Sequence, residues 1–284
     1  MADPYAPSNG LAIEARLDDV LQRAAFRDRF ITAFDRELTA VGAVDTAVIS
    51  DEALFSYADN TLASNAAAFL RERFDEFAVL VYLRRPDEFL TSLYSTHIKG
   101  GGTYELPEFV DRNTYRVRYA AALMPWIDQA PDALEVVAFD RRSLRDGDIL
   151  SDALARLGIE AVAEQGWVRN ESLSATGCEV LRKINLLCKK RGRARPGRLR
   201  AIMSRNFAGR PPSIPMRQRQ ALAEQLNSDH SQLMRIVSDV ERPNFYTLED
   251  VAHSTQDPPA ELDSDTTDAM ARSLLEAVTR LPKQ

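Results

Sequence analysis

Short, largely apolar runs that alternate with helical patterns constrain the fold of this chain most strongly. The runs are Thr46–Ser50, Ala78–Leu83 and Glu135–Phe139, and such runs are typical of strands that are covered on both faces. A segment with helical spacing follows each run, and the one after the second run begins near Pro86, which suits a first helical turn. This order predicts an α/β protein with a central parallel sheet between layers of helices.

Helical patterns dominate both ends of the chain. Apolar residues recur at helical spacing from Leu11 to Val41, which predicts two helices with a break near Phe26–Arg29. Beyond Gly158 the pattern is wholly helical, and Ser174 has a side chain that suits a helix N-cap. We therefore expect a mostly helical C-terminal region after the sheet.

The length of the chain favours one large domain. With 284 residues and 45% hydrophobic content, the chain can bury a substantial core. We expect an α/β domain over residues 1–252, with its helical portion beginning at about residue 160. Residues 253–267 are rich in Asp, Ser, Thr and Pro and are predicted to link this domain to a C-terminal helix over residues 268–284.

Cysteine usage and hydropathy favour a reducing, cytoplasmic location. Cys178 and Cys188 lie ten residues apart in one helical stretch, so they face different directions and we expect both to be reduced. The apolar run Phe77–Leu83 is too short to span a bilayer, and the N-terminus lacks the pattern of a signal peptide. The three histidines and two cysteines show no metal-ligand spacing, so we expect no metal site.

The net charge of −6 conceals a basic tract. Thirteen Lys or Arg residues and no Asp or Glu lie between Arg182 and Arg219. The segment Lys189–Arg195, with Arg191 and Arg193, can close over a phosphate, attract an anionic polysaccharide or remain solvated. Nucleic acid fits less well because the tract lacks interleaved aromatic residues and the chain as a whole is acidic.

Arg84 and Ser92 are the first candidates for binding a ligand. Open parallel sheets bind ligands at the carboxyl ends of their strands, and Arg84 directly follows the run Ala78–Leu83. Ser92 follows eight residues later, so a guanidinium and a hydroxyl can hold one phosphate from two sides. The alternative is that both residues belong to an ordinary solvent-exposed helix start.

The stretch Tyr82–Tyr94 resembles the strand and helix with which bacterial sulfotransferases hold the 3′-phosphate of their donor. Arg84 and Ser92 match the Arg and Ser of that pattern. The resemblance covers roughly Pro7 to Leu187 and includes several downstream segments: Tyr119, Trp126, Val136–Asp140, Leu144–Leu150, Leu157–Ile159, Asn170–Ser174, Leu181 and Asn185.

The resemblance implies a three-layer α/β nucleotide-binding fold of the P-loop type. It also implies transfer of a sulfuryl group from 3′-phosphoadenosine-5′-phosphosulfate to a hydroxyl of a carbohydrate or cell-envelope acceptor. Arg84 and Ser92 would then bind the small nucleotide donor, with Arg191 and Arg193 as further candidates.

The sequence departs from this family at its start. Members begin with a strand and a phosphosulfate-binding loop that contains Lys, Gly and Thr or Ser, and no such opening precedes Leu11. Lys99–Thr103 has a similar composition but follows the phosphate-binding helix, so we interpret it as a connection. We expect either a truncated enzyme, whose exposed strand edge would favour association, or a degenerate, noncatalytic member that binds anions or a protein partner.

Sulfuryl transfer needs a base that takes the proton of the acceptor hydroxyl. In the family this base is commonly His or Glu. The end of the expected strand Thr46–Ser50 would lie beside the donor site, so Glu52 is the first candidate and Asp51 the second. Asp51 can instead cap the following turn, and His97 lies about 140° around the helix from Ser92 and need not face the phosphate.

Overall fold

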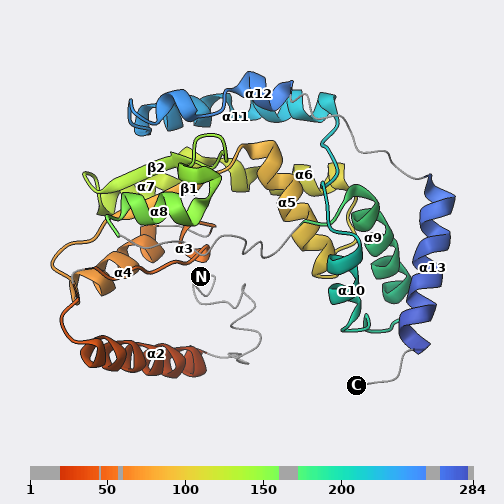
Figure 1. The fold of residues 1–284 in the computed structure, drawn as a ribbon, viewed down its shortest axis with the longest axis horizontal. Helices are drawn as coiled ribbons and strands as arrows, with labels where there is room; N and C mark the ends of the chain where they lie inside the picture. Colours follow the sequence, from red (N-terminus) through yellow and green to blue (C-terminus); the bar gives the residue numbers. More distant parts are fainter. Residues whose placement is uncertain (1–19, 45, 57–59, 160–171, 254–262, 281–284) are drawn as a thin grey trace. The chain divides into compact units, whose positions relative to one another are not determined.

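The computed structural model divides the chain into two compact units, Met1–Asp51 and Glu52–Gln284 (Figure 1). The expected division into a domain over residues 1–252, a linker and a C-terminal helix stays a prediction. The structure describes residues 20–44, 46–56, 60–159, 172–253 and 263–280. The start of the first predicted helix at Leu11 and most of the predicted linker lie outside the described residues.

In the described part of the first unit the chain forms a long helix, α2 (Val20–Val41). The helix continues through Phe26–Arg29, so the predicted break there is wrong. The segment contains neither Gly nor Pro, and nothing in its backbone interrupts the helix. The hydroxyls of Thr32 and Thr39 donate to backbone carbonyls four residues earlier, as is common on a continuous helix.

The predicted strand Thr46–Ser50 is also wrong. Its residues form no regular element and all five are exposed, including Val48 and Ile49. Composition alone cannot make a strand, because a strand needs a hydrogen-bonded neighbour. Within the part of the chain that the structure describes, the only sheet has two strands.

The second unit is built on a pair of parallel strands, β1 (Val79–Leu83) and β2 (Leu134–Ala138). Both strands were predicted from their apolar runs. Val81 lies opposite Val136 and Leu83 opposite Ala138, so these side chains share one face of the pair. The central parallel sheet of the prediction is therefore present only as a two-stranded ribbon in a largely helical, mixed α/β unit.

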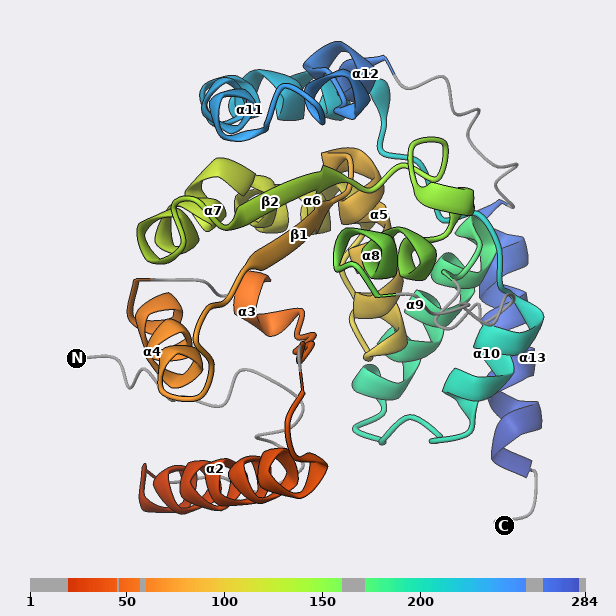
Figure 2. The ribbon, with the colours of Figure 1, turned by 60° about the vertical axis from the view of Figure 1, so that its left-hand side comes forward.

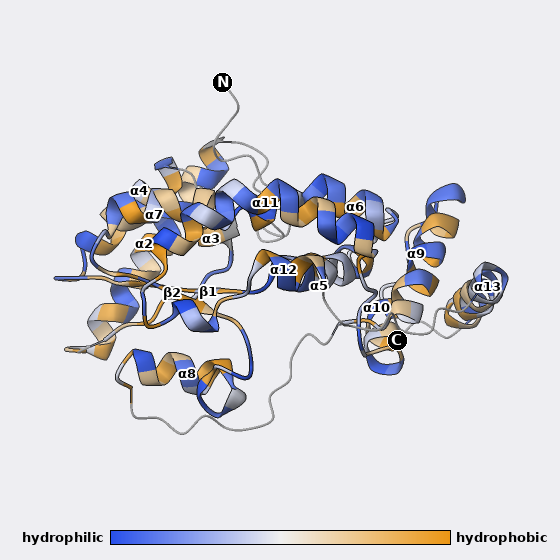
Figure 3. Ribbon diagram, turned by 90° about the horizontal axis from the view of Figure 1, so that it is seen from above, coloured by the Kyte–Doolittle hydropathy of each residue, from blue (hydrophilic) through white to orange (hydrophobic). Residues whose placement is uncertain are grey.

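Helices lie on both faces of the strand pair. Seen from above, α8 (Ile149–Arg156) lies on one side of β1 and β2, and α4 (Asn60–Arg71) and α7 (Tyr119–Gln129) lie on the other (Figure 3). The connection from β1 to β2 runs through α7 and three earlier elements: α5 (Pro86–Lys99), α6 (Leu106–Asn113) and η1 (Thr114–Val117). Such a helical crossover is what a parallel pair requires.

The described residues after β2 form helices and their connections, and this agrees with the predicted helical C-terminal region. Ser174 caps α9 (Ala175–Lys190), since its hydroxyl accepts a hydrogen bond from the N–H of Gly177 at 3.1 Å. The other elements are α3 (Ala53–Ser56), η2 (Arg145–Gly147), α10 (Leu199–Asn206), α11 (Met216–Ile236), η3 (Arg242–Asn244), α12 (Leu248–Ala252) and α13 (Ser264–Arg280).

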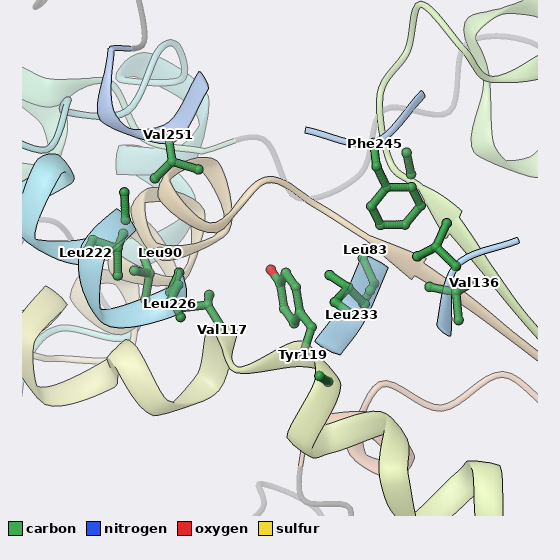
Figure 4. Close-up of a cluster of buried hydrophobic side chains, with 14 of the residues drawn as sticks. Leu83, Leu90, Val117, Tyr119, Val136, Leu222, Leu226, Leu233, Phe245 and Val251 are labelled. Atoms are coloured by element: carbon green, nitrogen blue, oxygen red, sulfur yellow. The ribbon is translucent and has the colours of Figure 1, made fainter. Parts of the chain in front are cut away.

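Two hydrophobic clusters hold the second unit together. In the first, the strand residues Leu83 and Val136 meet Tyr119 of α7 and Leu233 of α11 (Figure 4). The second joins α5, α9, α10 and α13 through fully buried side chains: Ile98, Leu181, Ile184, Leu199, Met203 and Ala271. Burial of apolar surface at these two clusters is the main force that stabilises the unit.

The N-terminus of α7 is capped by a residue of α11. This helix has no side-chain cap of its own, and Asp229 accepts hydrogen bonds from the N–H groups of Ala120 and Ala121 at 3.2 and 3.1 Å. Asp229→Ala is expected to lower the free energy of unfolding by about 1–2 kcal/mol, which urea denaturation can measure. Glu224→Ala, at an exposed position of the same helix, is the control, and equal midpoints for the two variants would contradict the prediction.

Candidate functional site

Arg84 lies where the two parallel strands end side by side. It directly follows β1, and Phe139 directly follows β2; the Phe139 N–H donates to the carbonyl of Leu83 at 2.8 Å. The guanidinium carbon of Arg84 is 4.5 Å from the centre of the Phe139 ring, a cation–π distance. Figure 2 shows both strands ending near the start of α5, the position predicted for a ligand.

The guanidinium of Arg84 is partly buried and has no ion pair within the described residues. Burial lowers the pKa of Arg84, and the nearby Glu88 partly opposes this effect. The backbone around Arg84 is fixed, because its carbonyl accepts a hydrogen bond from the buried Tyr119 hydroxyl at 2.8 Å. A positioned guanidinium with unused donors can bind a phosphate or a carboxylate.

Arg85, the next residue, has a different role. Its Nε and Nη2 donate to the two carboxylate oxygens of Asp87 at 2.6 and 3.0 Å, and Nη2 lies 3.1 Å from Glu88. This pairing raises the pKa of Arg85 despite its burial. Arg85 therefore holds the acidic first turn of α5, while Arg84 remains available.

Ser92 lies on the same side of α5 as Glu88. The two residues are four apart and so share a helix face, and Glu88 is the carboxylate that interacts with Arg84. Ser92 is partly buried, and its hydroxyl has no hydrogen-bond partner in the described part of the chain. Glu88 thus lies near Arg84 and on the same face of α5 as Ser92.

The other two predicted cofactor residues are at the far end of α5. Arg191 and Arg193 are exposed in the turn after α9. Nearby, Arg195 donates to the carbonyls of Ile98 and Lys99 in the last turn of α5, at 3.3 and 2.5 Å. This 14-residue helix is about 20 Å long, so Arg191 and Arg193 cannot hold the same phosphate as Arg84.

The candidate bases Asp51 and Glu52 are both exposed. They were predicted from the end of a strand at Thr46–Ser50, and that strand does not form. The geometric reason for choosing them is therefore lost. Asp51 ends the first unit and Glu52 begins the second, and their role as bases remains a prediction.

His97 and Cys178 serve packing. The His97 ring stacks on Tyr104 and lies against Phe109, and burial lowers the pKa of His97. Burial raises the pKa of the Cys178 thiol to about 12, so this free cysteine is unreactive at neutral pH. Within the described residues, neither side chain has a hydrogen bond or an ion pair with Arg84.

Phe139 is the residue of this site that the sequence reasoning missed. The sequence allowed this prediction, because the carboxyl ends of parallel strands meet at one edge of a sheet, and Phe139 is the last residue of the third apolar run, Glu135–Phe139. The hydrogen bond from Tyr119 to the Arg84 carbonyl could not be predicted from the sequence, because it depends on how α7 packs.

No group of three or more His, Cys, Asp or Glu side chains among the described residues is arranged to hold a metal ion. None of the described helices is both long enough and apolar enough to cross a membrane. Comparisons with models of protein families, with curated proteins and with solved structures found no match to this chain.

Proposed function

We propose that this protein binds the phosphate of a 3′-phosphoadenosine nucleotide at Arg84 and Ser92. The observation that carries the proposal is the guanidinium of Arg84, which lies at the carboxyl ends of two parallel strands, stacks on Phe139 and has no ion pair within the described residues. Its forked donors suit two phosphate oxygens. The Ser92 hydroxyl would supply a further hydrogen bond from the same face of α5.

In this proposal the reaction is the one that the sulfotransferase resemblance implies. A sulfuryl group passes from 3′-phosphoadenosine-5′-phosphosulfate to a hydroxyl of a carbohydrate or envelope acceptor. The S–O bond to the donor's phosphate breaks, a new S–O bond to the acceptor oxygen forms, and the hydroxyl proton goes to a base. Glu52 is the first candidate for that base, and Asp51 the second.

A noncatalytic anion-binding protein is the second candidate. The exposure of Asp51 and Glu52 favours it, because a general base works best in a site that excludes water. Under this alternative Arg84 binds the nucleotide phosphate but no sulfuryl group is transferred. The two candidates share the binding step and differ only in turnover.

Calorimetry with 3′-phosphoadenosine-5′-phosphate tests the shared step. Arg84→Ala is expected to weaken binding about 10- to 100-fold, because charge-assisted hydrogen bonds contribute about 1.5–3 kcal/mol. The matched control is Arg280→Ala, which removes the same charge from a side chain that is 82% exposed and paired with Glu276. Absence of binding, or an equal loss in both variants, would refute the site.

Turnover separates the two candidates. With the phosphosulfate donor and a hydroxylated acceptor, the enzyme should release 3′-phosphoadenosine-5′-phosphate. Glu52→Gln should abolish this release and leave the affinity for the product nucleotide unchanged. Tight nucleotide binding without any release, over a panel of acceptors, would instead support the anion-binding protein.

A further inference from the structure

The basic tract divides into structural and free cations. Arg182 pairs with Glu179 through two hydrogen bonds of 2.8 Å. Lys183 lies 3.0 Å from Asp268 and so joins α9 to α13. Arg195 satisfies carbonyls in the last turn of α5. These cations have roles within the fold and are not available to a partner.

Five of the remaining cations lie at one end of α9. We define the basic surface as these five residues, which lie at the end of α9, in the turn that follows and at the start of α10. All five are exposed, and none has an ion pair within the described residues. They are Lys189, Lys190, Arg191, Arg193 and Arg200.

A tight turn brings part of the basic surface together, because the N–H groups of Arg191 and Arg193 both donate to the Cys188 carbonyl, at 3.2 and 3.0 Å. Arg200 lies close enough to Arg195 to lower the pKa of Arg195, although burial is the larger cause. Arg191 and Arg195 both act on the thiol of Cys188, so the three arginines lie near one another. Their mutual repulsion is relieved when an anion binds.

The shape and composition of this surface indicate its partner. Residues 189–194 are six consecutive exposed residues, which is typical of a turn that protrudes. No large hydrophobic residue between 189 and 210 is exposed, so the surface offers neither aromatic rings for unpaired bases nor apolar side chains for a bilayer. Three of its five cations are arginines, whose forks fit phosphate oxygens.

We propose that the basic surface binds the phosphate backbone of a duplex nucleic acid. A duplex needs no aromatic stacking, and a protruding helical turn fits its grooves. Outside the tract there are 23 basic and 42 acidic residues, an acidic excess that repels a polyanion. The charge asymmetry therefore orients the basic surface toward it. This site is separate from Arg84, which lies at the other end of α5.

Fluorescence anisotropy with a labelled 20-base-pair DNA duplex tests the proposal. The full chain should bind the duplex with an affinity that falls steeply with salt. The triple variant Arg191→Gln, Arg193→Gln and Arg200→Gln should weaken binding roughly a hundredfold in 0.1 M salt. It should also reduce the slope of log affinity against log salt by about 2.7, since each phosphate contact contributes about 0.9.

A control triple variant removes the same charge elsewhere. Arg118→Gln, Arg235→Gln and Arg272→Gln change exposed arginines outside the tract and should leave duplex binding nearly intact, as should Arg84→Ala. Equal losses in the two triple variants would refute the basic surface. Binding to vesicles with 30% phosphatidylserine or to a sulfated polysaccharide, but not to the duplex, would overturn the assignment of the partner.

Discussion

Replacing Arg156 by alanine is expected to destabilise the second unit by about 3–5 kcal/mol, because it leaves buried carboxylates without their counterion. In the folded chain its Nε donates to Asp152 at 2.6 Å, its Nη1 pairs with Glu135, and its Nη2 lies 2.9 Å from Glu241. The Tyr82 hydroxyl also donates to Asp152, at 2.7 Å. One guanidinium thus joins β2, α8 and the turn after α11.

The pH dependence of this variant gives a second readout. Burial works to raise the pKa of Asp152, but the hydrogen bonds from Arg145, Arg156 and Tyr82 outweigh it, and the pKa is lowered. In the wild type Asp152 therefore contributes stability above its unfolded pKa, and this is lost as the pH falls through the lower folded value. In Arg156→Ala the carboxylates repel one another, so protonation should relieve the defect and the deficit should shrink toward pH 4.

Urea denaturation at pH 7 and pH 4 measures both effects. Arg142→Ala is the control, since Arg142 pairs with Asp140 at an exposed position and its loss should leave the midpoint nearly unchanged. A deficit for Arg156→Ala that is no larger than that of the control, or one that grows as the pH falls, would contradict the prediction.

The parts of the fold that local pattern determines were predictable. The apolar runs at β1 and β2 are buried between helices, and Ser174 caps α9 because a hydroxyl before a helix satisfies a free N–H wherever that helix packs. Pro86 begins α5 for the same local reason. These outcomes depend on residues within a few positions of one another.

The errors concern features that depend on distant partners. Thr46–Ser50 has the composition of a strand, but no described strand pairs with it, and pairing cannot be inferred from one segment. For the site, the position of Arg84 could be predicted because it directly follows a strand. The positions of Arg191 and Arg193 could not, because their distance from Arg84 depends on how α9 packs along α5.

Gly177→Ala is expected to destabilise the second unit by about 2 kcal/mol, even though alanine is the better helix former by about 1 kcal/mol. Gly177 lies in the first turn of α9, where a Cβ would meet Phe207 Cβ at 2.7 Å and the Phe207 carbonyl at 3.0 Å. That carbonyl cannot move freely, because it accepts a 2.7 Å hydrogen bond from the N–H of Ser174. Leu173 also pairs with Ala208 beside it.

To relieve this contact, the end of α10 would have to move away from the start of α9. We therefore expect the overpacking to cost more stability than the higher helix propensity of alanine adds. Gly197→Ala is the matched control: a Cβ there meets nothing within 4 Å, and the smaller backbone entropy of the unfolded chain should leave its stability equal or slightly higher. Thermal unfolding of the two variants decides the matter. A Gly177→Ala protein as stable as Gly197→Ala would show that Phe207 and Ser174 are free to move apart.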